Sequence, residues 1–361
     1  MGLKRVLSAT LVVATGIAAL LIHNGAADAL DAEAYFKGKT ITIHASGAGS
    51  TSDIMGRLIG LHMSKLIPGQ PQFKVQNWPT GMGVPVWRAV FTAKPDGLTW
   101  GHQQLQEWIS DFYLGGNPPQ GFNPEKIKRI GSPNLGLTIR VTCVHEELAT
   151  SYEEVLKKKL TLTHGSTRPG DSSGLGGAFV ELLGGPIKSI YGYQSNEVNT
   201  AFDRKEINVT NRCRDHQANP AWFDKSRQPN PVPIFKAGRG ETPEFYAKLG
   251  YPEPPDVLDL PGLKPSKGQV AALRTAMELS AIWRWTVFTH SDVPKDVQEV
   301  LMKAYYELSK IPEYIKTAEL AGVEIEPPSD EEAMASIAVV KDMAKDAEAV
   351  DFYKKLIGAV K

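Results

Sequence analysis

The sequence is poor in several features that mark common classes of protein. Its 40 Lys and Arg residues are balanced by 40 Asp and Glu residues, so no net charge attracts nucleic acid or an anionic membrane surface. Only two of the 361 residues are cysteine, Cys143 and Cys213, and neither has a partner at zinc-ligand spacing. These shortages predict a protein with no nucleic-acid partner and no zinc site.

Catalytic motifs are also missing. There is no phosphate-binding P-loop, and Gly47-Ala48-Gly49 resembles a dinucleotide fingerprint only until Ser52, which stands where its third glycine belongs. Ser166 lacks the flanking glycines of a nucleophile elbow. The sequence therefore predicts no cofactor, no metal and no enzymatic activity. An exported hydrolase that uses Ser166 or Ser172 with His164 is the catalytic alternative.

The N-terminus has the pattern of an export signal. Lys4 and Arg5 precede an apolar stretch over residues 6–22, and Ala27-Asp28-Ala29 suits a signal peptidase. We expect residues 1–29 to be a signal peptide and the mature protein to be periplasmic. The alternative is a retained membrane anchor, because the apolar stretch approaches the roughly 20 residues that span a bilayer.

The two cysteines leave two interpretations open. In an oxidising compartment Cys143 and Cys213 could form one disulfide that closes a long loop. They could equally remain two buried thiols that act as small hydrophobic side chains.

Short apolar runs alternate with amphipathic stretches from Thr40 onward, a pattern that predicts an α/β fold with a mainly parallel sheet. A length of 361 residues favours two domains. The proline-rich segment 219–265 is expected to form loops and short turns. The expected strands are 40–45, 73–77, 98–102, 136–144, 160–164 and 285–288. The expected helices are 53–66, 151–158, 195–204, 268–282, 294–309, 312–321 and 329–356.

Three Gly- and Ser-rich turns, 46–52, 80–83 and 165–174, are each expected to follow a strand and open a helix. The first amides of a helix have no intrahelical partner and carry roughly half a positive charge, so such turns can bind an anion without Lys or Arg. For any one turn taken alone, ordinary capping by Ser, Thr and Gly is the better explanation. Three turns together favour a carboxylate site at the carboxyl ends of the strands.

Several side chains next to these turns are candidates for ligand contact. Trp78 directly precedes the second turn and could form the floor of a pocket, although large apolar residues more often belong to the core. Asp53 could orient a ligand or serve only as a helix-terminal acid. Arg168 could hold a ligand carboxylate bidentately or be a solvated loop residue. His44 and His164 lie within two residues of a turn and are equally plausible as ordinary strand residues.

At this point the order and spacing of several segments resemble the Bug family, the substrate-binding proteins of tripartite tricarboxylate transporters. The resemblance extends from about Tyr35 to about Asp351. Its landmarks are FKGKTITI at 36–43, VQNWPTGMG at 75–83, KPDGLT at 94–99, HGS at 164–166, YGY at 191–193, and the stretch 293–324.

The resemblance implies a periplasmic-binding-protein-like α/β fold, with two lobes joined by crossing strands and a cleft between them. Lobe 1 would comprise 30–140 plus 286–361, and lobe 2 would comprise 141–285. The implied partners are a small carboxylate, either a di- or tricarboxylate or an aromatic acid, and a membrane permease. The implied ligand-binding residues are Ala48, Gly49, Ser50, Thr51, Asp53, Met82, Gly83, Ser166, Thr167, Ser172, Tyr193 and Asn196.

The turns also depart from the family pattern. The first turn lacks the usual Pro-Gly-Gly run, and the second has Met82 and Val84 where the family keeps small residues. The third turn is longer at 167–171. These departures keep a second hypothesis open, an exported interaction or sensory protein on the same scaffold whose pocket has degenerated.

Overall fold

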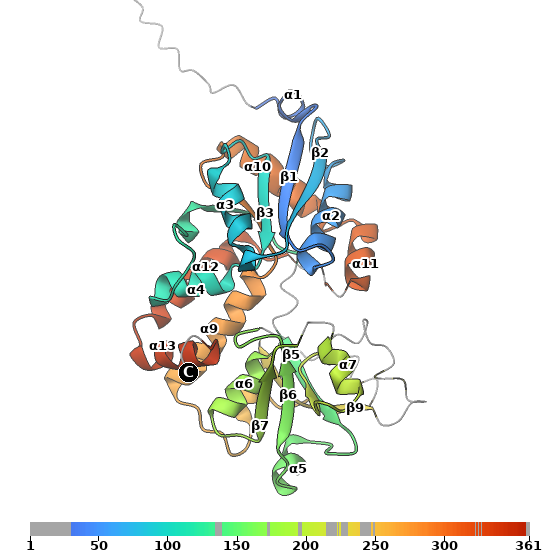
Figure 1. Ribbon diagram of the computed structural model, residues 1–361, viewed down its shortest axis with the longest axis vertical. Coiled ribbons are helices and arrows are strands. Elements are labelled where there is room, and N and C mark those ends of the chain that lie inside the picture. The colour runs from blue at the N-terminus through green and yellow to red at the C-terminus, as the bar shows by residue number, and fades with distance from the viewer. Residues whose placement is uncertain are drawn as a thin grey trace, which may run out of the picture. The chain divides into compact units, whose positions relative to one another are not determined.

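Two five-stranded sheets, each with flanking helices, organise the chain in this computed structural model (Figure 1). The structure describes residues 30–133, 139–171, 174–193, 197–213, 222, 224, 230–238, 247, 250–321, 323, 325 and 327–358. The predicted signal peptide, residues 1–29, lies outside this part of the chain. Within it, no helix combines the length and apolarity needed to cross a membrane.

The first sheet has the strand order β2-β1-β3-β10-β4. Strand β1 runs parallel to β2 and β3, whereas β10 is antiparallel to both of its neighbours. Ile41, Ile43 and Ala45 alternate toward the interior of β1, as the period of two in a strand requires. The strands are β1 (Thr40–Ser46), β2 (Gln72–Trp78), β3 (Thr99–Gln103), β4 (Ile127–Gly131) and β10 (Thr286–His290).

The second sheet repeats this arrangement in the order β7-β6-β8-β5-β9. Here β6 runs parallel to β7 and β8, and β5 is the antiparallel strand in the fourth position. The turns after β1 and β6 therefore leave equivalent positions of their sheets. The strands are β5 (Ile139–His145), β6 (Leu162–Ser166), β7 (Ile187–Tyr191), β8 (Val209–Thr210) and β9 (Pro231–Gly238).

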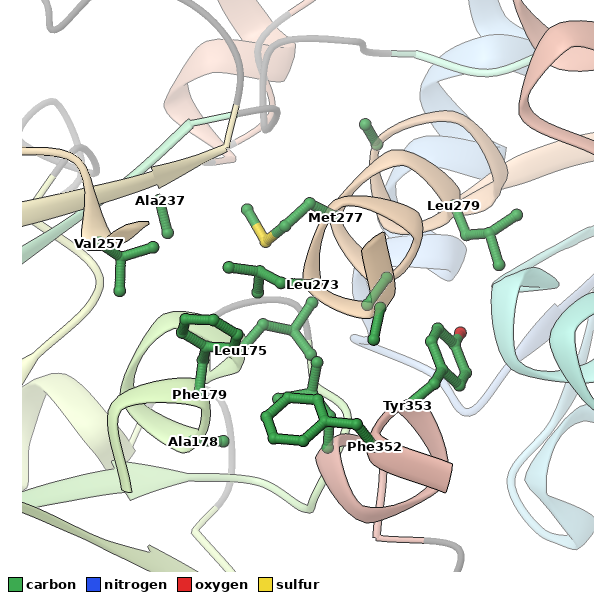
Figure 2. Close-up of a cluster of buried hydrophobic side chains, with 14 of the residues drawn as sticks. Leu175, Ala178, Phe179, Ala237, Val257, Leu273, Met277, Leu279, Phe352 and Tyr353 are labelled. Atoms are coloured by element: carbon green, nitrogen blue, oxygen red, sulfur yellow. The ribbon is translucent and has the colours of Figure 1, made fainter. Parts of the chain in front are cut away.

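Helix α9 (Lys267–Trp283) is central to the apolar core, where it packs against α4, α6, α12 and α13. Figure 2 shows its Leu273 and Met277 beside Leu175 and Phe179 of α6. The other helices are α1 (Ala32–Phe36), α2 (Thr51–Met63), α3 (Val84–Thr92), α4 (Gln106–Leu114), α5 (Tyr152–Lys157), α6 (Leu175–Leu182), α7 (Glu197–Asp203), α10 (Lys295–Leu308), α11 (Pro312–Leu320), α12 (Asp330–Met343) and α13 (Ala347–Leu356).

The predicted α/β class is confirmed, and most predicted elements agree with the structure to within a few residues. The sheets are mixed and not mainly parallel, because β10 and β5 each pair antiparallel with both of their neighbours. Lobe boundaries at 140/141 and 285/286 stay a prediction. The first sheet takes its strands from Thr40–Gly131 and Thr286–His290, and the second takes its strands from Ile139–Gly238.

Two sequence predictions were wrong. The segment expected to be only loops contains β9, whose Pro231 and Pro233 are tolerated because β9 lies at a sheet edge, where a strand needs fewer backbone donors. The helix expected over 329–356 is two helices, α12 and α13. Asp346 ends the continuity because its side chain accepts hydrogen bonds from the amides of Glu348 and Ala349 and so caps α13.

A disulfide joins Cys143 of β5 to Cys213, which lies just beyond β8. Both residues are fully buried beside Val141, Phe202 and Ile207. The bridge spans 70 residues and encloses the third turn in sequence. It ties β5 to the segment after β8, the strand that pairs with β6, from which that turn emerges.

We predict that replacing both cysteines by alanine lowers the free energy of unfolding by about 4 kcal/mol, because the unfolded chain regains the entropy of a long open loop. Urea unfolding at pH 7 measures the loss. Treating the wild type with a thiol reductant should reproduce most of it, and the double variant should not respond. Equal stability of the reduced and oxidised wild type would contradict the prediction.

Candidate functional site

The first two predicted turns lie side by side at the carboxyl edge of the first sheet. Parallel pairing places Ser46, the last residue of β1, opposite Trp78, the last residue of β2. Beyond them Gly47 approaches Pro79 so closely that a Cβ atom on Gly47 would lie 3.3 Å from Pro79 Cα. Helix α2 begins after the first turn and α3 after the second, so two helix N-termini open at this edge.

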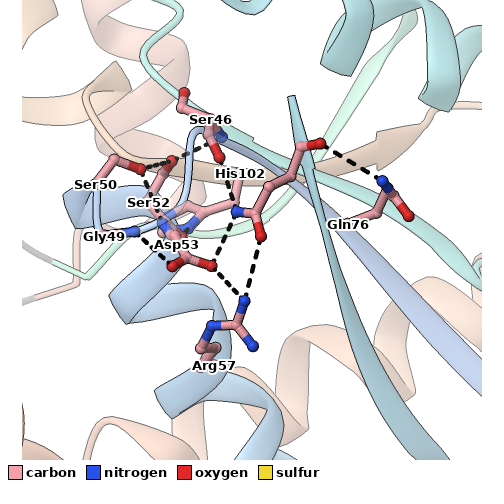
Figure 3. A network of polar contacts seen from close by, with 9 residues as sticks. Ser46, Gly49, Ser50, Ser52, Asp53, Arg57, Gln76 and His102 are labelled. Carbon is pink, nitrogen blue, oxygen red and sulfur yellow. Dashed lines mark hydrogen bonds and ion pairs between the residues drawn. The ribbon is translucent and has the colours of Figure 1, made fainter. Parts of the chain in front are cut away.

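A buried carboxylate organises the first turn (Figure 3). Asp53 is 4% exposed, and its carboxylate accepts hydrogen bonds from the Gly49 amide at 2.8 Å and Asn77 Nδ2 at 2.9 Å. It also forms an ion pair with Arg57 at 2.9 Å. Burial alone would raise the pKa of Asp53, but these donors outweigh it and the net pKa is lowered. Asp53 therefore holds the turn in place as a charged internal acceptor.

Further hydrogen bonds tie the turn to the sheet. Asn77 donates to the Ser46 carbonyl at 2.8 Å, and the Ser46 amide donates to Ser52 Oγ at 3.0 Å. The fully buried His102 of β3 lies 2.9 Å from the Ser52 carbonyl, to which its Nδ1–H donates. Burial lowers the pKa of His102 to about 4, so the ring is neutral at pH 7. Strands β1, β2 and β3 all contribute to this network.

The start of α2 offers two backbone amides to an anion. Ser50 is the N-cap, and its Oγ accepts a hydrogen bond from the Asp53 amide at 3.3 Å. The amides of Thr51 and Ser52 precede the first intrahelical bond and have no partner among the described residues. Ala48 and Gly49 in front of them are exposed. The arrangement therefore presents unpaired N–H groups and the positive end of the helix dipole.

The second turn forms the short helix η1 (Gly81–Gly83) that leads into α3. Gly83 has a φ of 87°, and a Cβ atom there would lie 2.5 Å from the side-chain oxygen of Gln103, so only glycine allows this approach. The backbone of Met82 lies in η1, and its side chain falls outside the described part of the structure.

Gln103, the last residue of β3, is a polar group that the sequence predictions missed. It is 3% exposed, and neither its amide nitrogen nor its oxygen has a hydrogen-bond partner among the described residues. Its packing on Gly83 places an unsatisfied donor and acceptor at the carboxyl edge of the sheet. A strand-end position was the available signal, because ligands of parallel sheets bind at that edge.

Trp78 is half-buried, and its indole N–H is already engaged. It donates to His44 Nδ1 at 2.9 Å, and the two rings stack with centroids 6.0 Å apart. Burial, followed by the charge of Lys74, lowers the pKa of His44 and favours the neutral ring that accepts this bond. Trp78 can therefore offer a ligand only its ring surface.

The third turn, after β6, is held by its own hydrogen bonds and by the segment after β7. Thr167 donates to Asp171, and its carbonyl accepts from the Gly192 amide at 3.1 Å. The Tyr193 ring packs against Gly165, where a Cβ atom would lie 3.3 Å away. Two other predicted contacts, Ser172 and Asn196, lie outside the described residues.

The geometry gives no support to a hydrolase that uses Ser166, and the alternative nucleophile Ser172 lies outside the described residues. Ser166 is 1% exposed, and its hydroxyl donates to the Arg168 carbonyl at 3.3 Å. His164 Nε2 is paired with the Asn211 side chain at 2.9 Å, and its Nδ1 has no partner among the described residues. Activation of a serine requires a direct hydrogen bond to a base. Ser166 and His164 each have a different partner here.

Arg168, the cation of the third turn, is paired with Glu107 of α4. Helix α4 begins shortly after β3, at the same edge as the first two turns. This ion pair therefore connects the third turn to the region where β3 ends. Glu107 is a second residue that sequence reasoning missed, since nothing in its local pattern distinguishes it from a solvated helix acid.

No three His, Cys, Asp or Glu side chains in the described ranges are grouped to bind a metal ion. A cavity of about 260 Å³ lies between α9 and the segment after β9, with Val257 and Met277 in its apolar wall and Asp256 and Arg274 as polar lining. None of the predicted ligand-binding residues lines it. Two larger hollows, of about 480 Å³ beside Pro68 and about 670 Å³ beside Val339, are lined by none of the predicted ligand-binding residues.

We predict that Asp53→Asn lowers the free energy of unfolding by about 2 kcal/mol at pH 7, because three charge-assisted contacts are weakened in a buried position. Urea unfolding measures the change. Asp342→Asn is the control, because Asp342 and its partner Lys345 are 80% and 78% exposed and such pairs contribute at most about 1 kcal/mol. Equal losses in the two variants would contradict the organising role of Asp53.

Acid should also weaken the fold through the buried histidines. The folded-state pKa values of His102 and His164 are lowered to about 4, whereas unfolded histidine titrates near 6.5. Because the unfolded state then binds more protons, stability present above about pH 6.5 falls as the pH drops toward 4, by up to about 1.4 kcal/mol per pH unit for each ring. Urea unfolding between pH 7 and 4.5 measures the slope.

The variant His102→Gln keeps a donor for the Ser52 carbonyl and removes one titrating ring. The free energy of unfolding of this variant should fall with decreasing pH about half as steeply as the two rings together predict. His62→Gln, on α2 outside the network, is the matched control. A wild-type slope that is unchanged in His102→Gln would rule out His102 as its source.

Comparison with known proteins identifies the fold. No protein-family model matches the chain, and no curated protein matches its sequence. Among solved structures it is similar to a TctC solute-binding protein from Polaromonas, with a TM-score of 0.61, 17% identity, and coverage of 89% of this chain and 99% of that one.

It is also similar to the periplasmic binding protein BugD, with a TM-score of 0.55, 15% identity and coverage of 87% and 98%. A third similar structure is R. palustris Rpa4515 with adipate, with a TM-score of 0.56, 14% identity and coverage of 87% and 97%. These neighbours are binding proteins and not enzymes. The chain has the two-lobed α/β fold of the TctC and Bug solute-binding proteins, as the sequence resemblance predicted.

Proposed function

We propose that this protein is an exported, periplasmic receptor that binds a small carboxylate at the carboxyl edge of its first sheet and delivers it to the permease of a tripartite tricarboxylate-type transporter. It is not an enzyme in this proposal. The observation that carries it is the pair of unpaired amides, Thr51 and Ser52, at a helix start that the buried Asp53 holds rigid.

The chemistry of the surrounding residues supports a carboxylate. An anion at the α2 N-terminus satisfies two N–H groups and gains from the helix dipole. The amide of Gln103 supplies a further donor, and the packing of Gln103 on Gly83 joins it to the second turn. Backbone and neutral amide donors of this kind hold a carboxylate through hydrogen bonds and need no full positive charge.

The neighbours support the class of ligand and the location. The similar structure from R. palustris contains adipate, a dicarboxylate. The fold belongs to periplasmic binding proteins, and the first 29 residues have the pattern of an export signal. A di- or tricarboxylate or an aromatic acid is the ligand that we propose. The residues at the three turns, including Ser172, would hold it together with Tyr193 and Asn196 after β7.

A second candidate function is an exported sensory or interaction protein on the same scaffold. The ion pair between Arg168 and Glu107 favours it, because a cation that could contact the ligand is already neutralised from within the chain. Direct ligand binding discriminates between the two candidates.

We predict that one or more small carboxylates raise the thermal stability of the purified mature protein. A ligand present at about 100 times its Kd stabilises the native state by about 2.7 kcal/mol. A thermal-shift panel should contain adipate, other di- and tricarboxylates and benzoate, with sugars and amines as controls. Stabilisation by sugars or amines, and by no acid, would discard the carboxylate receptor.

Thr51→Pro tests the amide directly. Proline removes the Thr51 N–H at the first helical position, where its ring is tolerated, and the preceding Ser50 already has the extended backbone that proline requires. Calorimetry should show at least tenfold weaker binding of the stabilising acid with little loss of stability. Thr51→Ala keeps the amide and should bind like the wild type. Tight binding by Thr51→Pro would exclude the amide from the site.

A further inference from the structure

We propose that Glu107 is a built-in competitor for the ligand: its carboxylate occupies Arg168 in the free protein and must leave when a ligand carboxylate takes its place. The inference rests on the proposed function, because it concerns the same site. It assigns to Glu107 a role in setting affinity, although this residue belongs to none of the three turns.

The ion pair has the geometry of a replaceable contact. One guanidinium nitrogen of Arg168 contacts one carboxylate oxygen of Glu107. The side chains are 40% and 27% exposed, so the pair is within reach of solvent and of a small solute. A ligand carboxylate would present the same two oxygens to the same guanidinium, and could bind it bidentately.

The carboxylate of Glu107 uses only part of its hydrogen-bonding capacity in this position. Its second carboxylate oxygen is buried and has no hydrogen-bond partner among the described residues. Asp111, one helical turn further along α4, is close enough that the charge of Glu107 adds to burial in raising the pKa of Asp111. A carboxylate with one oxygen unpaired and a second acid beside it gains little from staying in place, which lowers the cost of displacing it.

The backbone around Arg168 is fixed, so the exchange concerns side chains. Pro169 packs against Gly358, where a Cβ atom would lie 2.2 Å from the proline ring. Gly170 approaches Ile357 to such a degree that a Cβ atom there would lie 3.2 Å from the Ile357 carbonyl oxygen. Pro169 and Gly170 thus pack against the C-terminal end of α13, and the long Arg168 side chain is the group that can change partners.

Competition of this kind predicts a gain of affinity on removal of the competitor. Glu107→Gln keeps the size of the side chain and removes its charge, so a ligand carboxylate no longer has to displace a negative group from Arg168. We expect Glu107→Gln to bind adipate, or the best acid of the panel, at least fivefold more tightly than the wild type by calorimetry. Glu107→Asp, which shortens the reach to Arg168, should show a smaller gain and is available if Glu107→Gln does not fold.

A double-mutant cycle links the effect to Arg168. Arg168→Gln should weaken binding, and adding Glu107→Gln to it should change affinity less than twofold. Glu147→Gln is the matched control, because the Glu147–Lys205 pair has side chains 43% and 53% exposed and lies outside the three turns. It should bind like the wild type.

The outcomes separate this inference from the proposed function. Wild-type binding with an unchanged affinity in Glu107→Gln overturns the competitor and leaves the receptor intact. Two results support the competitor. In the first, Glu107→Gln binds a carboxylate that the wild type does not bind. In the second, Glu107→Gln binds more tightly than the wild type, and this gain in affinity disappears when Arg168 is replaced. If neither protein binds any carboxylate of the panel, the proposed function fails and the inference fails with it.

Discussion

The geometry of the site depends on one buried negative charge. Asp53 lies three residues into α2, and its carboxylate collects the Gly49 amide, the Asn77 side chain and Arg57 at 2.8–2.9 Å. Together with the hydrogen bond from Asn77 to the Ser46 carbonyl, these contacts fix the end of β1, the end of β2 and the start of α2 relative to one another. With the turn held in this way, the amides of Thr51 and Ser52 keep their direction without a ligand. Such preorganisation lowers the entropy lost on binding.

The two sheets share one strand arrangement, but their corresponding turns are stabilised differently. Each has the same order, with three parallel strands, an antiparallel strand in fourth place and a final edge strand. The turn after β6 is therefore the counterpart of the turn after β1, although the residues that stabilise them differ. Asp53 reaches back to an amide in the first turn, whereas Thr167 and Asp171 close the third turn on itself. One turn is left with open amides, and the other carries a cation that already has a partner.

Much of the fold could be predicted from the sequence, because hydrophobic periodicity and turn residues act locally. The alternation of Ile41 and Ile43 predicts strand β1, and the capping box of Ser329 and Glu332 predicts the start of α12. The failures have local causes too. The prolines of β9 led the sequence analysis to predict loops where the structure has an edge strand. Asp346 was included in one long predicted helix, although it caps the separate helix α13.

The site was predictable only in part, because partners across the sheet are not visible in a sequence. The Gly- and Ser-rich turns identified the helix starts, but the pairing of Trp78 with His44 and of Arg168 with Glu107 depends on residues at least 34 positions apart. Gln103 carried no motif at all, and its importance comes from lying at the end of β3 against Gly83.

The most direct test follows the α2 amides themselves. In a ¹⁵N-resolved NMR titration of the mature protein with adipate or the best acid of the panel, the Thr51 and Ser52 amide signals should move downfield and saturate with the calorimetric Kd. Saturable binding that leaves both signals in place would contradict the account, because the acid would then be held somewhere other than at the start of α2.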